Sequence, residues 1–214
     1  MRHRAKLVGL RTCVKNQIHA VLAGAGVQVP MSDLFGASGR DLLAQTRLAP
    51  QSRARTDSLL RLIENLDFEV ELFAKLVAGR LRGDPGYQAI QAIPGVGPIL
   101  AAVFVAEIGD IGRFHRPAQL ASWAGLTPKH HESDTTVHRG RITKQGSRLV
   151  RWAAVEAVQR VPAHTRLGQR RDRIGERRGR NIGVVAAARD LVTLVFYGLR
   201  DHHLHCLPAR MPVA

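Results

Sequence analysis

Apolar residues recur at every third or fourth position along most of this chain, which is the spacing of amphipathic helices. One stripe runs through residues 4–24 and a shorter one through residues 39–48. Two apolar helices flank a turn at residues 94–98, a short helix starts at Pro117, and further helices cover residues 146–161 and 181–201. The chain has no run of alternating apolar and polar positions, which a half-buried strand would show. The pattern predicts a mainly α fold.

The helix over residues 55–83 carries a regular apolar seam. Its members step by four and three alternately: Leu59, Ile63, Leu66, Val70, Phe73 and Val77. This is the a/d pattern of a coiled coil over about three heptads. It fits a helical hairpin or an intermolecular coiled coil, and equally an amphipathic helix packed on its own domain. We expect a homo-oligomer formed through this seam, whose number of copies the pattern does not set.

The turn "PGVGP" at residues 94–98 has the pattern of a helix-hairpin-helix. Gly95 and Gly97 allow a tight turn, and Pro98 suits the first turn of the next helix. The exposed N–H groups of such a hairpin bind a phosphate without reading sequence. The alternative is a plain αα-hairpin.

Charge changes the picture from fold to partner. The chain holds 32 Lys and Arg against 17 Asp and Glu, a formal charge of +15. Such an excess favours a polyanion, because each neutralised phosphate releases counterions. A ribosome-type RNA binder and a membrane-surface protein are alternatives. Seven arginines fall within residues 166–180, in a loop or a frayed helix. Of these we expect Arg170, Arg171, Arg177 and Arg178 to contact nucleic acid.

Compartment and metal content follow from a few residues. Two cysteines are too few for a disulfide framework or a zinc cluster. The apolar stretch at residues 184–199 is interrupted by Arg189 and Asp190 and is shorter than the roughly 20 residues of a membrane-spanning helix. The acidic residues of the seam helix form its solvated face, and "HHLHC" at residues 202–206 is too crowded for a zinc site. We expect an intracellular protein without a metal site or a membrane span.

Ser133 is the candidate for chemistry. Phosphoryl transfer needs an aligned nucleophile and cations that stabilise the charge on the phosphate oxygens. The basic residues that follow are Arg139, Arg141, Lys144, Arg148 and Arg151. His130, His131 and His138 could move a proton, and nothing selects among them. The alternative is an ordinary serine in a polar loop.

Several segments of the chain also resemble those of a known family. The segments "IPGVGP", "LASWAGLTP", a serine five residues after that proline, and "GRITKQGSRLVRWAAVEA" occur in this order. Together they resemble the C-terminal domain of the insertion-sequence one-ten, one-sixteen and nine-oh-two transposase family. "LRTCVKNQIHAVL" is similar to the basic helix before the family's coiled coil, and "GVVAAARDLVTLVFYGL" to its closing helix.

The resemblance implies a function. Family members recombine DNA with a RuvC-like N-terminal domain that binds magnesium through four acidic residues, a coiled coil, and a C-terminal domain with a serine nucleophile, and a bridge RNA guides them. By position Ser133 matches that serine, although "ESDT" stands where the family usually has Ser-Ser-Gly-Gly. We expect three segments: a basic helix and coiled coil at 1–84, a transposase C-terminal domain at 85–200 and a tail at 201–214.

The expected role is that of a bacterial insertion-sequence transposase, acting in the cytoplasm at the nucleoid. It would cleave and exchange DNA strands through Ser133, with DNA and a guide RNA as partners. No RuvC-like domain precedes Met1, so we expect a truncated copy or a late start that is inactive alone and binds no cofactor within this chain. The alternative is a non-catalytic helical module that binds DNA or RNA.

Overall fold

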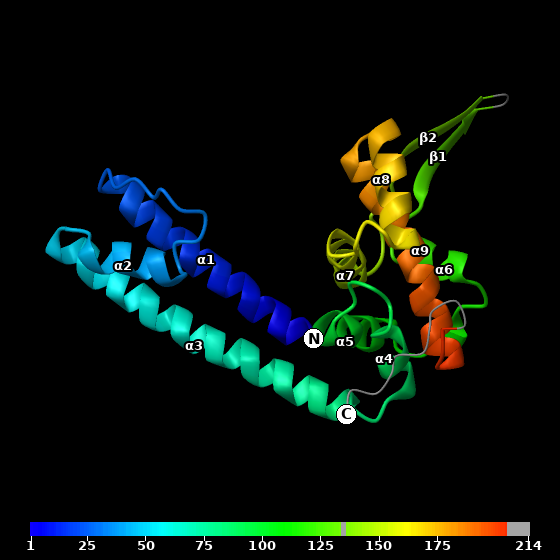
Figure 1. Ribbon diagram of the computed structural model, residues 1–214, viewed down its shortest axis with the longest axis horizontal. Coiled ribbons are helices and arrows are strands. Elements are labelled where there is room, and N and C mark those ends of the chain that lie inside the picture. Colours follow the sequence, from blue (N-terminus) through cyan, green and yellow to red (C-terminus); the bar gives the residue numbers. More distant parts are fainter. Residues whose placement is uncertain (134–135, 205–214) are drawn as a thin grey trace. The chain divides into compact units, whose positions relative to one another are not determined.

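The computed structural model describes residues 1–133 and 136–204, except for the side chains of residues 130–139. In this part of the chain, helices alternate with short turns and a single two-stranded hairpin (Figure 1). The predicted mainly α fold is therefore confirmed. The chain divides into two compact units, Arg2–Lys75 and the part from Leu76 onward. The expected boundaries at residues 84 and 200 stay predictions.

The first unit is a helical hairpin with a short helix beside it. It contains α1 (Arg2–Gly24), α2 (Ala37–Gln45) and most of α3 (Pro50–Leu81). α1 and α3 run side by side in opposite directions (Figure 1), and Arg11 of α1 forms an ion pair with Asp67 of α3. The core between the helices is made of Val14, Ile18, Leu22, Leu34, Leu43, Leu59 and Ile63. Burial of these side chains supplies most of the unit's stability.

The predicted seam of α3 is used within the chain. Leu59, Ile63 and Val70 are buried, and Leu66 packs on the same core. His3 of α1 meets the Phe73 ring edge-on, with the ring centroids 4.7 Å apart. Of the interpretations left open above, the structure shows α3 packed against other helices of its own chain. An intermolecular coiled coil stays a prediction.

The second unit wraps a central helix. Its elements are α4 (Pro85–Ile90), α5 (Pro98–Ile108), the 3-10 helix η1 (Ile111–Arg113), α6 (Pro117–Trp123), β1 (Pro128–Ser133), β2 (Thr136–Ile142), α7 (Arg148–Gln159), α8 (Arg166–Arg178) and α9 (Arg180–Asp201). α9 packs against α4, α6, α7 and α8. Its side chains at Leu191, Val192, Val195 and Phe196 are fully buried. By length and composition α9 could cross a membrane, but half of its apolar window is buried in this unit, as in the core helix of a globular domain.

The hairpin of β1 and β2 corrects the expectation that the chain has no strands. The two strands are antiparallel, and the register pairs Pro128 with Ile142 and Ser133 with Thr136. Alternating apolar and polar positions are expected of a strand that packs one face on a core, and this segment lacks them. Charged and polar residues follow one another directly from Lys129 to Glu132. The segment expected as a serine loop is therefore largely regular.

Residues 166–178 of the arginine-rich segment form one continuous helix, α8, and Gly179 separates it from α9, which begins at Arg180. Thr165 caps the start of α8, because its hydroxyl accepts the N–H of Gly168 at 3.1 Å. Gly168 and Gly175 do not break the helix, and Gly183 of α9 lets the two helices approach closely. A Cβ on Gly183 would lie 2.3 Å from the carbonyl oxygen of Arg171 and 2.7 Å from the nitrogen of Gly175. The prediction of a loop or a frayed helix is therefore wrong for residues 166–178, and the helix ends at Gly179.

Candidate nucleic-acid interface

The base of the β-hairpin is a close crossing of two backbone segments. Gly125 and Gly146 have φ of 70° and 74°, where other residues are strained. A Cβ on Gly146 would lie 1.6 Å from the carbonyl oxygen of Trp123, and one on Gly125 would lie 2.2 Å from that of Gln145. Only glycine fits both places. Two glycines thus determine where the hairpin leaves the helices.

Backbone hydrogen bonds hold this crossing together. The N–H of Thr143 donates to the carbonyl of Thr127 at 2.9 Å, and the N–H of Lys144 donates to that of Gly125 at 3.1 Å. Lys144 itself is exposed and has the left-handed φ of 56°, which is unusual for a side chain of its size. The strain at Lys144 is a local cost of closing the base of the hairpin.

Arg151 ties the crossing to α7. Its Nη1 donates to the carbonyl of Ala124 at 2.8 Å and to that of Gln145 at 3.1 Å. Burial lowers the pKa of Arg151, and the neighbouring charge of Arg148 lowers it further. The predicted phosphate ligand Arg151 therefore has a position inside the fold, whereas Arg148 is exposed at the start of α7.

The start of α7 is joined to α5. The hydroxyl of Ser147 accepts the N–H of Val150 at 3.3 Å and donates to Glu107 at 2.9 Å. The N-terminus of α7 is therefore capped by its own side chain. Exposed cations at the hairpin's base include Lys129, Arg141, Lys144 and Arg148.

Ser133 is the last residue of β1, at the end of the strand opposite the clamped base. Its side chain, that of Arg139 and those of the three candidate proton carriers lie outside the described side chains. Their backbone register is defined: His130 pairs with Arg139, and His131 with His138. The fold thus puts Ser133 on the same hairpin as Arg139 and Arg141.

The turn between α4 and α5 contains both glycines, and the helix-hairpin-helix stays a prediction. Gly95 has φ of 86°, and a Cβ there would lie 2.2 Å from the carbonyl oxygen of Ala157 in α7. Gly97 is the exposed N-cap of α5, with open space around it, and Pro98 is the first helical residue. Gly95 therefore serves packing, and Gly97 is the residue whose backbone a phosphate can approach.

The arginines of α8 fall into two groups. Arg170 forms an ion pair with Asp190 of α9. Arg171 donates to the carbonyls of Val158 and Val161 at 2.9 and 3.0 Å, and it also pairs with Asp172. Arg177 and Arg178, in the last turn, are exposed. Two of the predicted ligands thus have partners within the protein, and two project to solvent.

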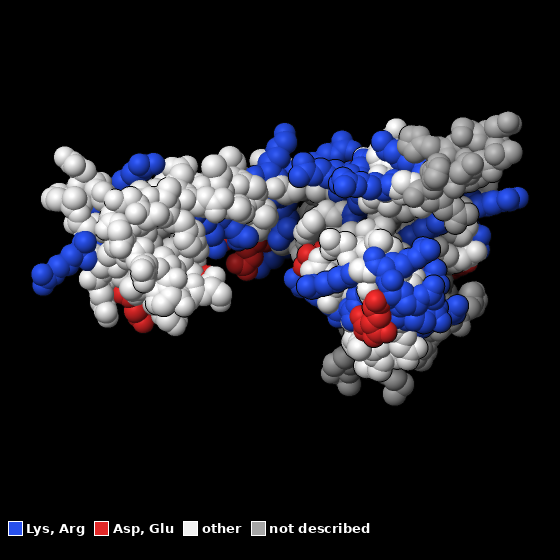
Figure 2. All heavy atoms as spheres, turned by 90° about the horizontal axis from the view of Figure 1, so that it is seen from above, with Lys and Arg blue, Asp and Glu red and all other residues white. Residues whose placement is uncertain are grey.

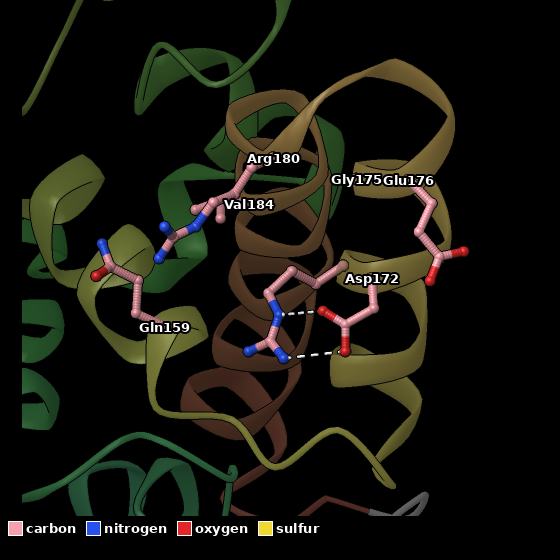
Figure 3. Close-up of a pocket in the computed structure, with 7 residues that line it drawn as sticks. Gln159, Asp172, Gly175, Glu176, Arg180 and Val184 are labelled. Carbon is pink, nitrogen blue, oxygen red and sulfur yellow. Dashed lines mark hydrogen bonds and ion pairs between the residues drawn. The ribbon is translucent and has the colours of Figure 1, made fainter.

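A mixed-charge pocket of about 620 Å³ lies between α7, α8 and the start of α9 (Figure 3). Arg171 and Asp172 pair on one wall, and Arg180 extends toward Gln159 on the other. Glu176 adds a second carboxylate. Acids offset the cations here, so this hollow is a weaker candidate for a polyanion than the open surface.

The solvent-exposed surface of the second unit is strongly basic. Figure 2 shows Lys and Arg over much of the visible face of the second unit, with few acids between them. Within the described residues, no group of three or more His, Cys, Asp and Glu could hold a metal ion. The "HHLHC" segment extends beyond Leu204 and so lies partly outside the described part.

Sequence comparison now adds to this geometry. The profile of the family described as "Transposase IS116/IS110/IS902 family" matches residues 87–174, which include the α4–α5 turn, the hairpin and α7. Residues 87–174 are thus similar to the domain of this transposase family. The resemblance noted in the sequence is therefore confirmed.

Individual relatives extend the family match beyond that domain. A "Probable family 20 transposase" of Pseudomonas aeruginosa is 28% identical over 167 residues, 75% of this chain and 48% of the relative. The transposase for insertion sequence element IS1111A of Coxiella burnetii is 26% identical over 193 residues, 86% of this chain and 53% of the relative. A pilin gene-inverting protein of Moraxella bovis is 29% identical over 119 residues, 53% of this chain and 36% of the relative. The chain spans about half the length of the two transposases.

One residue of the family domain has a setting that the sequence analysis overlooked. The guanidinium of Arg113, at the end of η1, lies over the rings of Phe114 and Trp123, with 4.7 Å to each centroid. The available signal was the basic and aromatic mixture of "GRFHRP" at residues 112–117. The second ring comes from α6, which spacing along the chain does not reveal.

Proposed function

We propose that this protein is part of an insertion-sequence transposase, in which Ser133 attacks a DNA phosphodiester and the basic surface of the second unit holds the strand. The family match supports the assignment. The observation that carries it is the hairpin, which has a clamped base and ends β1 at Ser133.

The proposed step is a transesterification. The Ser133 hydroxyl gives up its proton as its oxygen bonds to phosphorus, and the bond from phosphorus to the leaving sugar oxygen breaks. That oxygen takes up a proton and leaves as a hydroxyl. The phosphoserine link keeps the energy of the broken ester, so a hydroxyl of a second strand can reverse the step and complete the exchange.

The cations at the base of the hairpin supply electrostatic help. Arg141, Lys144 and Arg148 are exposed and close to one another in the chain. Fixed positive charges aimed at a phosphate stabilise the extra negative charge of its transition state.

Binding without catalysis is the alternative function. It is favoured by "ESDT" at residues 132–135, which replaces the small residues usual in the resembling family. In that case the exposed turn at Gly97, the hairpin cations and Arg177 with Arg178 would bind DNA or RNA without cutting it.

The proposed partners are DNA, a guide RNA and further copies of the chain, in the bacterial cytoplasm at the nucleoid. α3 leaves a second set of apolar side chains exposed: Leu62 at 45%, Phe68 at 67% and Leu72 at 38%. We place self-association there, because the first seam is occupied by α1. Sedimentation should show a smaller assembly for Phe68→Glu than for the unmodified chain, and equal masses would refute this surface.

Covalent trapping tests the function. The chain is mixed with labelled DNA carrying an insertion-sequence end and with the N-terminal half of a full-length relative. We expect a protein–DNA adduct that survives denaturant and is lost in Ser133→Ala. The exposed Ser122 is the matched control, since Ser122→Ala should keep the adduct. DNA binding without any Ser133-dependent adduct would favour the binding module.

A further inference from the structure

Arg113 is restrained before any ligand arrives. Its guanidinium carbon lies 4.7 Å from the centroids of two neighbouring rings, which are themselves 5.6 Å apart at an interplanar angle of 58°. Phe114 and Trp123 are both half-buried, while Arg113 is exposed. Aromatic faces attract a cation and limit its rotamers, so less side-chain entropy is lost when it binds.

The donors of Arg113 remain available. No carboxylate among the described residues lies within ion-pair distance of it. Asp110, three residues earlier, uses its carboxylate to cap η1, accepting the N–H of Gly112 at 2.8 Å. A planar guanidinium offers parallel N–H groups that match two oxygens of one phosphate. Arg113 is therefore a preorganised cation without a described anion.

The position of Arg113 connects it to the hairpin. The ring of Trp123 contacts Arg113, and the carbonyl of the same residue lies at the close crossing with Gly146. His115 and Arg116 follow on an exposed turn, where Gln119 Oε1 accepts both of their N–H groups at 2.8 and 3.3 Å. Trp123 thus links Arg113 to the base of the hairpin.

We propose that Arg113 binds a backbone phosphate of the DNA, with Phe114 and Trp123 holding its guanidinium in place. The inference rests on the proposed function, because it assumes that DNA is brought to the hairpin. It adds a phosphate-binding residue, and its positioning rings, to the surface predicted from the sequence.

The chain contains a matched control in Arg200. Its guanidinium also lies over two rings, 5.3 Å from Phe196 and 4.9 Å from Tyr197. Its Nε and Nη2 donate to the carboxylate of Asp201 at 2.6 and 2.8 Å. Arg113 and Arg200 therefore share charge and aromatic setting, and they differ in whether a described carboxylate occupies the guanidinium.

The experiment compares salt dependence of binding. Affinities of the full chain for a labelled random-sequence DNA duplex are measured between about 50 and 200 mM salt. Arg113→Gln should make the slope of log affinity against log salt shallower by about 0.9, the loss of one phosphate contact. Arg200→Gln should leave the slope unchanged. Arg113→Lys should keep the slope and bind several-fold more weakly, because it retains the charge and loses the planar fork. Circular dichroism confirms that each variant is folded.

The outcomes separate the role of Arg113 from the proposed function. If the unmodified chain binds and Arg113→Gln keeps its slope, the inference is overturned while the proposed function stands. If the unmodified chain shows no salt-dependent binding, both fall. The same measurement with an RNA duplex separates the two nucleic acids: a loss seen with RNA alone would overturn the assignment to DNA.

Discussion

At the scale of single residues, Arg151 stabilises the fold through two backbone carbonyls. Arg151→Gln should lose both charged hydrogen bonds to Ala124 and Gln145, at a cost of about 1.5–3 kcal/mol in the free energy of unfolding. Urea denaturation measures this loss. The exposed neighbour is the control, since Arg148→Gln should change stability by less than about 0.5 kcal/mol. Equal effects of the two substitutions would contradict the clamp.

The pair of Arg170 and Asp190 should make stability depend on pH. Burial raises the pKa of Asp190, and Arg170 partly offsets that rise. Its folded pKa therefore lies above the unfolded value, so the charged carboxylate costs stability at neutral pH, and this cost disappears as pH falls through the folded pKa. Arg170→Ala removes a partner of the charged form only. The variant should lose about 1 kcal/mol or less at neutral pH, because both side chains are partly exposed, and less still in acid.

Chemical denaturation at a series of pH values measures this difference. In an Asp190→Asn background no carboxylate is left to titrate at that position, so the effect of Arg170→Ala should become independent of pH. A loss that is as large in acid as at neutral pH, with Asp190 present, would refute the role of the pair.

At the scale of elements, the hairpin depends on the crossing at its base. Gly146→Ala would combine a left-handed φ with a Cβ 1.6 Å from a carbonyl oxygen, and we expect it to cost about 3 kcal/mol or more. Gly97→Ala is the comparison, because its φ of −85° and its open surroundings admit a methyl group within about 1 kcal/mol. Thermal unfolding of the two variants tests this, and similar midpoints would show that the crossing adapts.

Helix positions could be predicted from sequence because their signals are local. Pro98 and Pro117 both lie in the first turn of the helix whose start they predict. The glycines of residues 166–180 give an ambiguous signal, since Gly168 and Gly175 lie within α8 and Gly179 ends it. The two hydrogen bonds of Arg151 could not be predicted from the sequence, because only the fold brings the carbonyls of Ala124 and Gln145 together. Ser133 was expected as the nucleophile from the family resemblance, and that role stays a prediction, while its place at a strand's end needed the structure.

At the scale of the whole molecule, the excess of positive charge should govern nucleic-acid binding. If the surface contacts about six phosphates, the logarithm of affinity should fall with the logarithm of salt at a slope of about −5. The double variant Arg177→Gln, Arg178→Gln should reduce the slope by up to about 2. Fluorescence anisotropy over a salt series measures both values, and a slope near zero would show that the charge of +15 serves another purpose.

The hairpin leaves the second unit and returns to it at one point, where Thr127 and Thr143 share a hydrogen bond of 2.9 Å. The length of such a hairpin can vary, because opposed residue pairs can be added or removed without changing the distance between its ends. Each added pair would carry Ser133 roughly 3.4 Å further from the helices. The distance from Ser133 to the helices can thus change while the packing of those helices stays the same. The same helices could therefore serve substrates of different width.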